Sequence, residues 1–292
     1  MCMKLHLVDA TFELFRAFFS HPAEVAPDGR PVNAVHGLVD SMLSLLREPD
    51  VTHIAAATDH VIESWRNDVF AGYKSSAGMP PELLSQFGDA ERALRALGIV
   101  TWPRVEDEAV DALATAVARF EDDPRVEQVI VCSVDKDLAQ CVRGQHVVLR
   151  DRMRRITYDQ DGVRAKFGVA PASIPDYLAL VGDSSDGYPG LPGWGAKSAA
   201  AILARWGTLD AIPDSALDWD VPLRNASRLA ATLQQQREDA ILYRHLARLK
   251  TDSAITDDLD ALEWRGVPRE TFLSLCDELG FDTIRQRVHR WT

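Results

Sequence analysis

The sequence predicts an α/β domain followed by a helical domain. In the first half of the 292-residue chain, short apolar runs alternate with longer amphipathic stretches, which is typical of strands joined by helices in a parallel sheet. From about Pro171 onward this strand pattern disappears and apolar residues recur at helical spacing. Because 46% of the residues are hydrophobic, the chain can bury a sizeable core, which excludes a mainly disordered protein.

Three predicted strands end at an aspartate. The apolar runs at 4–8, 53–58 and 129–134 are followed by Asp9, Asp59 and Asp135 respectively. In open parallel sheets, ligands bind outside the carboxyl ends of the strands, so three such carboxylates would converge on one site. Each aspartate by itself could equally be the N-cap of the following helix. Three aspartates at the ends of three strands together favour a shared ligand-binding site.

The remaining elements follow from periodicity and from turn residues. Stretches rich in Pro, Gly and Ser at 21–31 and 74–80 predict loops. The scattered cysteines form no C-x-x-C pair, so neither a disulfide framework nor a zinc site is expected. Apolar spacing predicts helices at 35–46, 81–97, 107–120, 174–181, 196–206, 225–247 and 269–279, with turns at 183–195 and 212–220.

Five further acids join the strand-end aspartates as candidate metal ligands. Glu108 and Asp111 are three residues apart, which places both on one face of a helix. Two like charges 4 Å apart cost about 4 kcal/mol at an effective dielectric of 20, so such a cluster needs cations. Oxygen ligands select Mg²⁺ or Mn²⁺, and two such ions can drive phosphodiester hydrolysis. The alternative is that most of these acids are helix caps and solvated charges. The other three are Asp137, Asp183 and Asp186.

A Gly-rich turn leads directly into the helix predicted at 196–206. Glycines there let backbone N–H groups approach a phosphate, and the helix N-terminus favours an anion. This helix-hairpin-helix pattern binds a DNA backbone without reading its sequence; the alternative is a tight structural turn. The residues concerned are Gly190, Gly193, Gly195, Lys197 and Ser198.

The net charge argues against nucleic acid as a partner. With 32 Lys and Arg against 44 Asp and Glu, the chain carries a net charge of −12. A phosphate-rich partner must therefore be held by local basic patches or by metal ions. No apolar run approaches the roughly 20 residues of a membrane helix, and residues 1–7 are too short for a signal peptide. We therefore expect a cytoplasmic protein with no membrane partner.

Four segments together resemble the bacterial and phage 5′-3′ exonucleases and flap endonucleases, including the 5′ nuclease domain of bacterial DNA polymerase I. The resemblance extends from Leu7 to about Leu249. Its two most specific motifs are a D-K-D-x-x-Q segment at 135–140 and a G-D-x-x-D-x-x-P-G-x-x-G-x-G-x-K segment at 182–197. The other two are Val8-Asp9 with Phe15-Arg16-Ala17-Phe18, and Asp59 with Trp65-Arg66 and Tyr73-Lys74.

The resemblance implies a PIN-like (resolvase-like) catalytic domain with a helical arch at 1–170. A helix-three-turn-helix DNA-binding domain would follow at 171–260, and a helical tail at 261–292. It implies hydrolysis of DNA near a 5′ flap, a nick or a free 5′ end, in replication and repair. Two Mg²⁺ or Mn²⁺ ions would act in cleavage, and K⁺ would bind at the hairpin. We expect a monomeric, stand-alone nuclease.

The resemblance also assigns roles to single residues. Arg66 and Lys74 would contact the scissile or terminal phosphate, and Tyr73 would lie at the base of the arch and contact DNA. Asp183 and Asp186 would complete the second metal site. The remaining carboxylates would hold the metals directly or through water: Asp9, Asp59, Glu108, Asp111, Asp135 and Asp137.

Three departures from the family pattern stand out. Val110 replaces one carboxylate of the family's E-A-D-D element, and Asp107 is not expected to substitute because it faces another side of the helix. Residues 75–78 lack the usual Arg-Pro-Pro turn, and Gly187 stands where the family often has Asn. A DNA-binding protein with weak or lost cleavage is therefore an alternative. A third hypothesis is a phosphatase with Asp135 as nucleophile.

Overall fold

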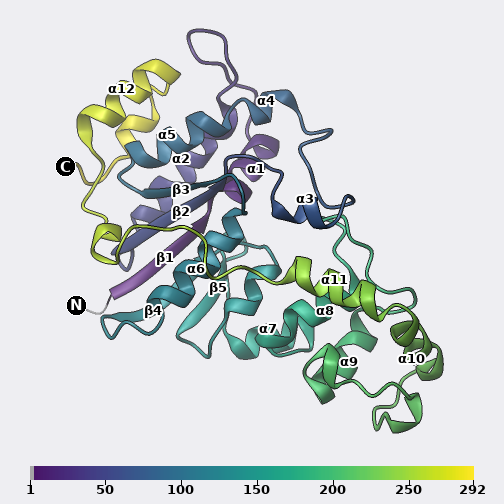
Figure 1. Cartoon of the computed structure of the whole chain (residues 1–292). Coiled ribbons are helices and arrows are strands. Elements are labelled where there is room, and N and C mark those ends of the chain that lie inside the picture. The colour runs from purple at the N-terminus through teal and green to yellow at the C-terminus, as the bar shows by residue number, and fades with distance from the viewer. Residues whose placement is uncertain (1–2) are drawn as a thin grey trace. The chain divides into compact units, whose positions relative to one another are not determined.

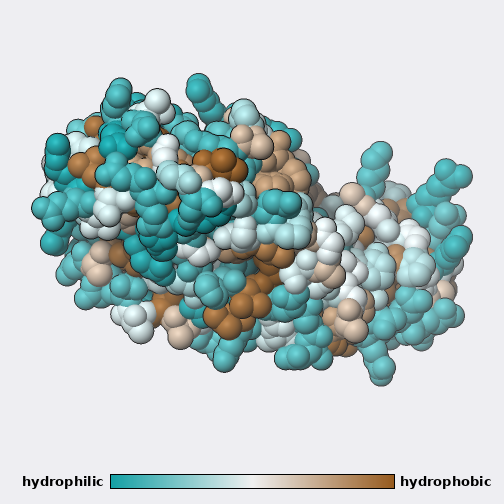
Figure 2. Space-filling view, turned by 90° about the horizontal axis from the view of Figure 1, so that it is seen from above, coloured by the Kyte–Doolittle hydropathy of each residue, from teal (hydrophilic) through white to brown (hydrophobic). Residues whose placement is uncertain are grey.

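The computed structural model describes residues 3–292, which fall into two compact units (Figure 1). Each unit is discontinuous in sequence, because the chain leaves the first unit and returns to it twice. Hydrophilic side chains dominate the face seen in Figure 2, and apolar side chains appear there only in small groups. The first unit comprises residues 1–64, 76–133 and 251–292, and the second comprises 65–75 and 134–250.

The first unit is built on four parallel strands. Their order is β3-β2-β1-β4, with β1 (Met3–Asp9) between β2 (His53–Asp59) and β4 (Val126–Cys132), and with β3 (Val100–Arg104) at the outer side of β2. Strand β2 is buried along its whole length, which explains its continuous apolar run. The prediction that β1 and β2 end at aspartates is confirmed. The prediction that the third strand ends at Asp135 is wrong, because β4 ends at Cys132, two residues before the end of its apolar run.

Helices pack on both sides of this sheet region in Figure 1. Helix α1 packs against α2, and α12 packs against α5. The predicted helix at 269–279 is confirmed residue for residue as α12. The helices of this unit are α1 (Ala10–Ser20), α2 (Asn33–Leu46), α4 (Pro81–Leu84), α5 (Phe87–Ala96), α6 (Ala109–Phe120) and α12 (Arg269–Leu279).

The single helix predicted at 81–97 is wrong, because the chain breaks between α4 and α5 at Gln86. The Gln86 side chain is fully buried, and its Oε1 accepts the backbone N–H groups of Ala34 at 2.8 Å and Val35 at 3.2 Å. The first N–H groups of α2 have no partner within their own helix. Gln86, which is 52 positions from Ala34 in the sequence, supplies that partner. No local sequence pattern could therefore indicate that the helix is interrupted at Gln86.

The second unit combines an antiparallel strand pair, β5 (Val147–Asp151) and β6 (Ile156–Tyr158), with a set of short helices. The predicted helices at 174–181 and 196–206 are confirmed with the same boundaries. The helices are α3 (Trp65–Val69), α7 (Gln160–Phe167), α8 (Ile174–Val181), α9 (Ala196–Trp206), α10 (Ala226–Gln235) and α11 (Arg237–Ala247), with a 3₁₀ turn η1 (Asp137–Cys141).

The continuous helix predicted at 225–247 is also wrong. The chain turns at Gln236, where φ is −118° and ψ is 31°, and divides the segment into α10 and α11. Helix α11 packs along α8, as Figure 1 shows, whereas α10 buries Leu229 and Leu233. One straight helix would keep both halves on one axis, so it could not follow two different packing partners. No Pro or Gly marks this turn in the sequence.

No helix within residues 3–292 is long and apolar enough to cross a membrane. Cys132, Cys141 and Cys276 are buried and form no disulfide among residues 3–292. Cys2 lies outside the described residues.

Candidate metal centre

Three buried aspartates of the second unit form a compact cluster. One carboxylate oxygen from each of Asp137, Asp183 and Asp186 lies within 4.8 Å of the other two. Their side chains are 3%, 2% and 6% exposed. Asp137 begins the 3₁₀ turn η1, and the other two lie in the turn that follows α8. Among residues 3–292 this is the one group of three metal-binding side chains that approach so closely.

The turn after α8 holds two of these aspartates through its own backbone. The Asp183 carbonyl accepts N–H groups from Gly187 at 2.9 Å and Tyr188 at 3.1 Å, and the Asp183 N–H donates to the Tyr188 carbonyl at 2.9 Å. Asp183 Oδ1 also accepts the Ser185 N–H at 2.9 Å. The short spacing between the two aspartates is thus fixed by a closed local turn.

Gly187 closes this turn at a position where a side chain does not fit. Its φ is +87°, which L side chains rarely adopt, and a Cβ there would lie 2.2 Å from the Gly72 carbonyl oxygen. Real contacts of that length do not occur, so this turn excludes every side chain. The close approach joins the turn to residues 65–75 of the same unit.

Two lysines balance part of the negative charge. Lys136 Nζ lies 2.7 Å from Asp183 Oδ2, and Lys74 Nζ lies 3.2 Å from Asp186 Oδ1. Burial, followed by the charges of the three neighbouring aspartates, nevertheless raises the pKa of Asp137 well above its usual value. The lysines therefore leave the cluster short of positive charge.

The donor set of this cluster fits a hard divalent cation. Asp137 Oδ1 is buried and, within residues 3–292, has no hydrogen-bond partner. Such orphaned acceptors are rare in native structures, since burial without a partner costs free energy. An ion coordinated by oxygen atoms alone would satisfy this atom and neutralise its neighbours. Asp135 is half-buried beside them and accepts the Asp137 N–H at 2.9 Å.

The strand-end aspartates of the first unit both bind backbone N–H groups at the start of a helix. Asp9 Oδ1 accepts the Phe12 N–H at 2.9 Å, which caps α1, and Asp9 Oδ2 accepts the Ser133 hydroxyl at 2.7 Å. Asp59 Oδ1 accepts the Ala109 N–H at 2.6 Å, at the first turn of α6. The capping alternative therefore holds for Asp9, whereas Asp59 bonds the first turn of a distant helix whose N-cap is Glu108; both aspartates lie at the carboxyl ends of two neighbouring strands.

Glu108 and Asp111 are arranged differently from the prediction. The helix begins at Ala109 rather than at 107, so Glu108 is its N-cap, and the Glu108 N–H donates to Asp111 Oδ2 at 3.1 Å. Glu108 Oε1 accepts the Ser64 hydroxyl at 2.7 Å. The two carboxylates are thus held in the first unit by capping rather than by a shared helix face. Asp107 bonds Arg104 at 2.6 Å and does not replace the missing acid, as expected.

Arg66 occupies a more enclosed position than a phosphate contact requires. Its side chain is only 1% exposed, and its Nε donates to the Leu246 carbonyl at 2.8 Å, at the C-terminal end of α11. Its guanidinium also lies 4.6 Å from the Trp65 ring centre. Tyr73 is 4% exposed, so its ring is buried too. The phosphate-contact and DNA-contact roles of these residues stay predictions.

The Gly-rich turn presents an open helix N-terminus. Gly193, Gly195 and Lys197 are exposed, and the Ser198 hydroxyl accepts the Gly195 N–H at 3.1 Å. Trp194 is 7% exposed and donates its indole N–H to the Leu229 carbonyl at 3.2 Å. Its ring is therefore packed inside the second unit and is not available to stack on a base.

Tyr188 is a site residue that the sequence did not reveal. It is 1% exposed, its ring lies 5.6 Å from that of Tyr243, and its hydroxyl has no hydrogen-bond partner among residues 3–292. Burial and then the nearby acids, Asp137 first, raise its pKa. It follows Gly187 in the turn, where nothing in the pattern distinguishes it from an ordinary turn residue.

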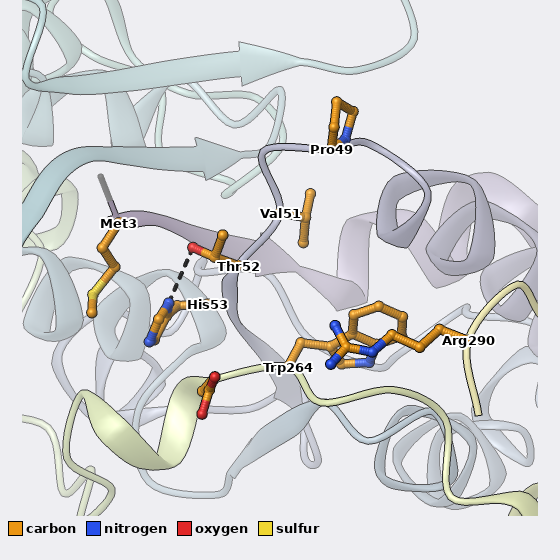
Figure 3. A pocket seen from close by; sticks show the side chains of 8 residues that line it. Met3, Pro49, Val51, Thr52, His53, Trp264 and Arg290 are labelled. Carbon is orange, nitrogen blue, oxygen red and sulfur yellow. Dashed lines mark hydrogen bonds between the residues drawn. The ribbon is translucent and has the colours of Figure 1, made fainter. Parts of the chain in front are cut away.

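A separate cavity of about 500 Å³ lies at the other end of the strands, in the first unit (Figure 3). His53 and Thr52 on its wall are joined by a 3.1 Å hydrogen bond. Since β1 and β2 are parallel, their amino ends are remote from Asp9 and Asp59. The cavity is lined by Met3, Pro49, Val51, Thr52, His53, Glu263, Trp264 and Arg290.

Comparison with protein families defines the class to which this architecture belongs. Residues 4–168 match the 5′-3′ exonuclease N-terminal resolvase-like domain, and residues 169–270 match the 5′-3′ exonuclease C-terminal SAM fold. The protein is therefore a resolvase-like α/β domain followed by a helical SAM-like domain, as the sequence predicts. The chain belongs to the 5′-3′ exonuclease family. The aspartate-based phosphatase alternative has no support from these matches.

Individual relatives agree with this assignment. The chain is 33% identical to DNA polymerase I of Bacillus caldotenax over 293 residues, covering 99% of this chain and 32% of the relative. It is 36% identical to DNA polymerase I of Pseudomonas aeruginosa over 287 residues, covering 95% and 30%. The chain thus spans about a third of the length of these polymerases.

Solved structures show the same fold at low sequence identity. The 5′-exonuclease of bacteriophage T5 with bound zinc has a TM-score of 0.67 and 17% identity, covering 94% of this chain and 99% of its own. The catalytic core of Rad2 in complex with DNA has a TM-score of 0.63 and 14% identity, covering 98% and 91%.

Proposed function

We propose that this protein is a divalent-metal-dependent 5′-3′ exonuclease and flap endonuclease that cleaves DNA near 5′ flaps, nicks and free 5′ ends in replication and repair. The observation that carries the proposal is the buried cluster of Asp137, Asp183 and Asp186, with its orphaned carboxylate oxygen. Family membership supports it, as do the zinc-bound T5 exonuclease and the DNA-bound Rad2 core.

Two Mg²⁺ or Mn²⁺ ions are proposed as cofactors. When bound, such ions supply an activated water and stabilise the leaving oxygen of the phosphodiester. The second-unit cluster would hold one ion, with Asp135 beside it. The acids of the first unit would hold metal directly or through water: Asp9, Asp59, Glu108 and Asp111.

The chain's own cations would position the DNA. Lys74 and Lys136 already lie against carboxylates of the cluster, so a phosphate oxygen bound there would meet ammonium groups. The exposed N-terminus of α9, with Lys197, offers backbone N–H groups to a second phosphate. K⁺ binding at this hairpin, a monomeric state and a cytoplasmic location are parts of the same proposal.

A cleavage assay tests the proposal directly. Wild type and Asp183→Asn are compared on labelled 5′-flap, nicked and single-stranded DNA, with Mg²⁺, Mn²⁺ or EDTA. We expect product from wild type only with a divalent ion, and a loss of at least a hundredfold in the variant. The exposed Asp252→Asn serves as control and should cleave like wild type. Equal rates in wild type and Asp183→Asn would refute the metal assignment.

A second candidate is a flap-DNA-binding protein with weak or lost cleavage. It is favoured by Val110, which is 7% exposed on α6 where the family has a carboxylate. Tight flap binding with no product at any metal concentration would support this candidate. In that case Val110→Asp should raise turnover, because it restores the missing acid beside Asp111.

A further inference from the structure

The charge of this protein is divided very unevenly between its two units. The first unit has 14 Lys and Arg against 29 Asp and Glu, a net charge of −15. The second has 18 against 15, a net charge of +3. The second unit is the one that carries the Gly-rich turn and α9. The overall charge of −12 therefore conceals a basic part of the chain.

The basic residues of the second unit include a concentrated group at the β5–β6 turn. Between 150 and 155 the sequence Arg-Asp-Arg-Met-Arg-Arg places four arginines beside one aspartate. Arg154 and Arg155 are exposed and Arg152 is half-buried; Arg154 is 73% exposed even with its 3.5 Å ion pair to Asp151. Asp151 is buried, and it also accepts the Arg154 N–H at 2.9 Å. We call Arg152, Arg154 and Arg155 the basic turn.

Lys166 of α7 adds a fourth cation beside the basic turn. Its Nζ lies 4.4 Å from the ring centre of Tyr158, a residue of β6 that pairs with Leu149 of β5. The position of Lys166 is therefore fixed over the strand pair. Burial lowers its pKa, the charge of Asp151 raises it, and the charge of Arg154 lowers it. Lys166 and Arg154 are thus close enough to repel each other, with one buried carboxylate, Asp151, between the cations of this surface.

The basic turn connects through α7 to the phosphate-binding end of α9. Helix α7 ends at Phe167 and is capped by Gly168, where a Cβ would lie 2.7 Å from the Cβ of Ala200 in α9. Ala200 is about one helical turn from the N-terminus of α9, where Lys197 is exposed. Figure 1 shows α7 and α9 as neighbours in the same unit. Lys197, Lys166 and the basic turn thus lie on elements of one unit that pack in succession: α9 against the end of α7, and α7 against β6.

We propose that the basic turn and Lys166 bind the phosphate backbone of the same DNA duplex that α9 holds. Guanidinium groups bind phosphates by paired hydrogen bonds, and the contacts carry no sequence preference. Duplex DNA is favoured over an acidic protein partner because the surface continues from a second phosphate site. This inference rests on the proposed function only for the identity of the polyanion.

The test is the salt dependence of DNA binding. The variant Arg152→Gln, Arg154→Gln, Arg155→Asn removes the basic turn; Asn is chosen because residue 155 has a φ of 56°, which Asn tolerates. Affinity for 5′-flap DNA is measured by fluorescence anisotropy in EDTA between 50 and 300 mM KCl. Since each phosphate contact contributes about 0.9 to the slope of log K against log salt, the slope should fall by about 2 to 3.

The matched control removes three arginines from the first unit instead. Arg95, Arg125 and Arg265 are each about half-exposed or more and each pairs with an acid, so their triple change to Gln alters the net charge equally. We expect the basic-turn variant to bind at least tenfold more weakly than wild type at 100 mM KCl, and the control to bind like wild type. Circular dichroism checks that both are folded.

The outcomes separate this inference from the proposed function. If both variants lose affinity equally, or if neither does, the basic turn is not a DNA-binding surface, and an acidic protein becomes its better partner. If wild type cleaves no DNA but only the basic-turn variant has the shallower slope, the surface is confirmed and the nuclease proposal fails. If wild type cleaves DNA but the basic-turn variant has the same slope as wild type, the nuclease proposal stands and the basic turn is not a DNA-binding surface.

Discussion

The ammonium group of Lys136 lies 2.7 Å from Oδ2 of the buried Asp183, inside a cluster of three aspartates. Burial opposes the charge on Lys136, but its hydrogen bond to Asp183 and the surrounding aspartates raise its pKa above the usual value. The side chain is 33% exposed, so this cation lies at the edge of the cluster. Lys136 therefore acts as an internal counter-charge for carboxylates that would otherwise repel one another.

Replacing that counter-charge should destabilise the metal-free protein. In Lys136→Met, we expect the free energy of unfolding in EDTA to fall by about 1–3 kcal/mol, because a buried charge loses its partner. Saturating Mg²⁺ should reduce the deficit, since the ion supplies positive charge at the same place. Urea denaturation with and without Mg²⁺ measures both effects. The exposed Lys197→Met is the control, and an equal loss there would contradict the assignment.

Removing one carboxylate of the cluster should stabilise the metal-free protein, whereas removing Lys136 should destabilise it. Asp137→Asn keeps the shape of the side chain but removes a buried carboxylate whose pKa burial and the neighbouring aspartates raise. We expect its melting temperature in EDTA to rise above that of wild type, whereas Mg²⁺ should no longer stabilise it. In wild type, an ion at 100 times its dissociation constant adds about 2.7 kcal/mol. A variant that is still stabilised by Mg²⁺ as wild type is would exclude Asp137 as a ligand.

The turn after α8 should tolerate no side chain at Gly187. In Gly187→Ala, residue 187 would keep a positive φ and its new Cβ would clash with the Gly72 carbonyl oxygen. We therefore expect the free energy of unfolding to fall by about 1–3 kcal/mol or more. Gly88 provides the comparison, because it lies in α5 and a Cβ added there would have no atom within 4 Å. Gly88→Ala should instead stabilise the protein by about 0.5–1 kcal/mol. Equal effects in chemical denaturation would refute the close contact.

Acid should remove a small contribution that ionised Glu278 makes to the stability of the folded protein. Hydrogen bonds from Arg92 first and then Arg30 lower its pKa from 4.5 to about 2. Because the folded-state pKa is depressed, this stabilisation is present above about pH 4.5 and is lost as pH falls toward 2. The carboxylate is 40% exposed, so solvent screening limits it to less than about 1 kcal/mol.

The Glu278→Gln variant isolates this contribution. Wild type should be more stable than the variant at pH 7, and the difference should shrink at pH 3. Measurement of unfolding free energies at both values tests the sign. A difference that grows on acidification would contradict the depressed pKa.

Much of the fold follows from the sequence because its signals are local. The runs ending at Asp9 and Asp59 and the helical spacing at 174–181 depend on neighbours within a few residues, so the pattern predicts them directly. The motif at 182–197 likewise marks two of the three clustered aspartates, because the turn that holds them closes on itself.

Contacts between distant segments required the tertiary structure. Gln86 breaks a predicted helix because α2 needs its side chain, and Arg66 is buried because it donates to the end of α11, 180 residues away. Contacts between distant segments also bury the Tyr188 hydroxyl without a partner among residues 3–292. They likewise bring the elements that carry Lys197, Lys166 and the basic turn together. By itself, the sequence determined which strands, turns and acids this protein has. Only the tertiary structure decided which of those groups are buried, capped or brought together, because burial and pairing depend on residues far apart in the chain.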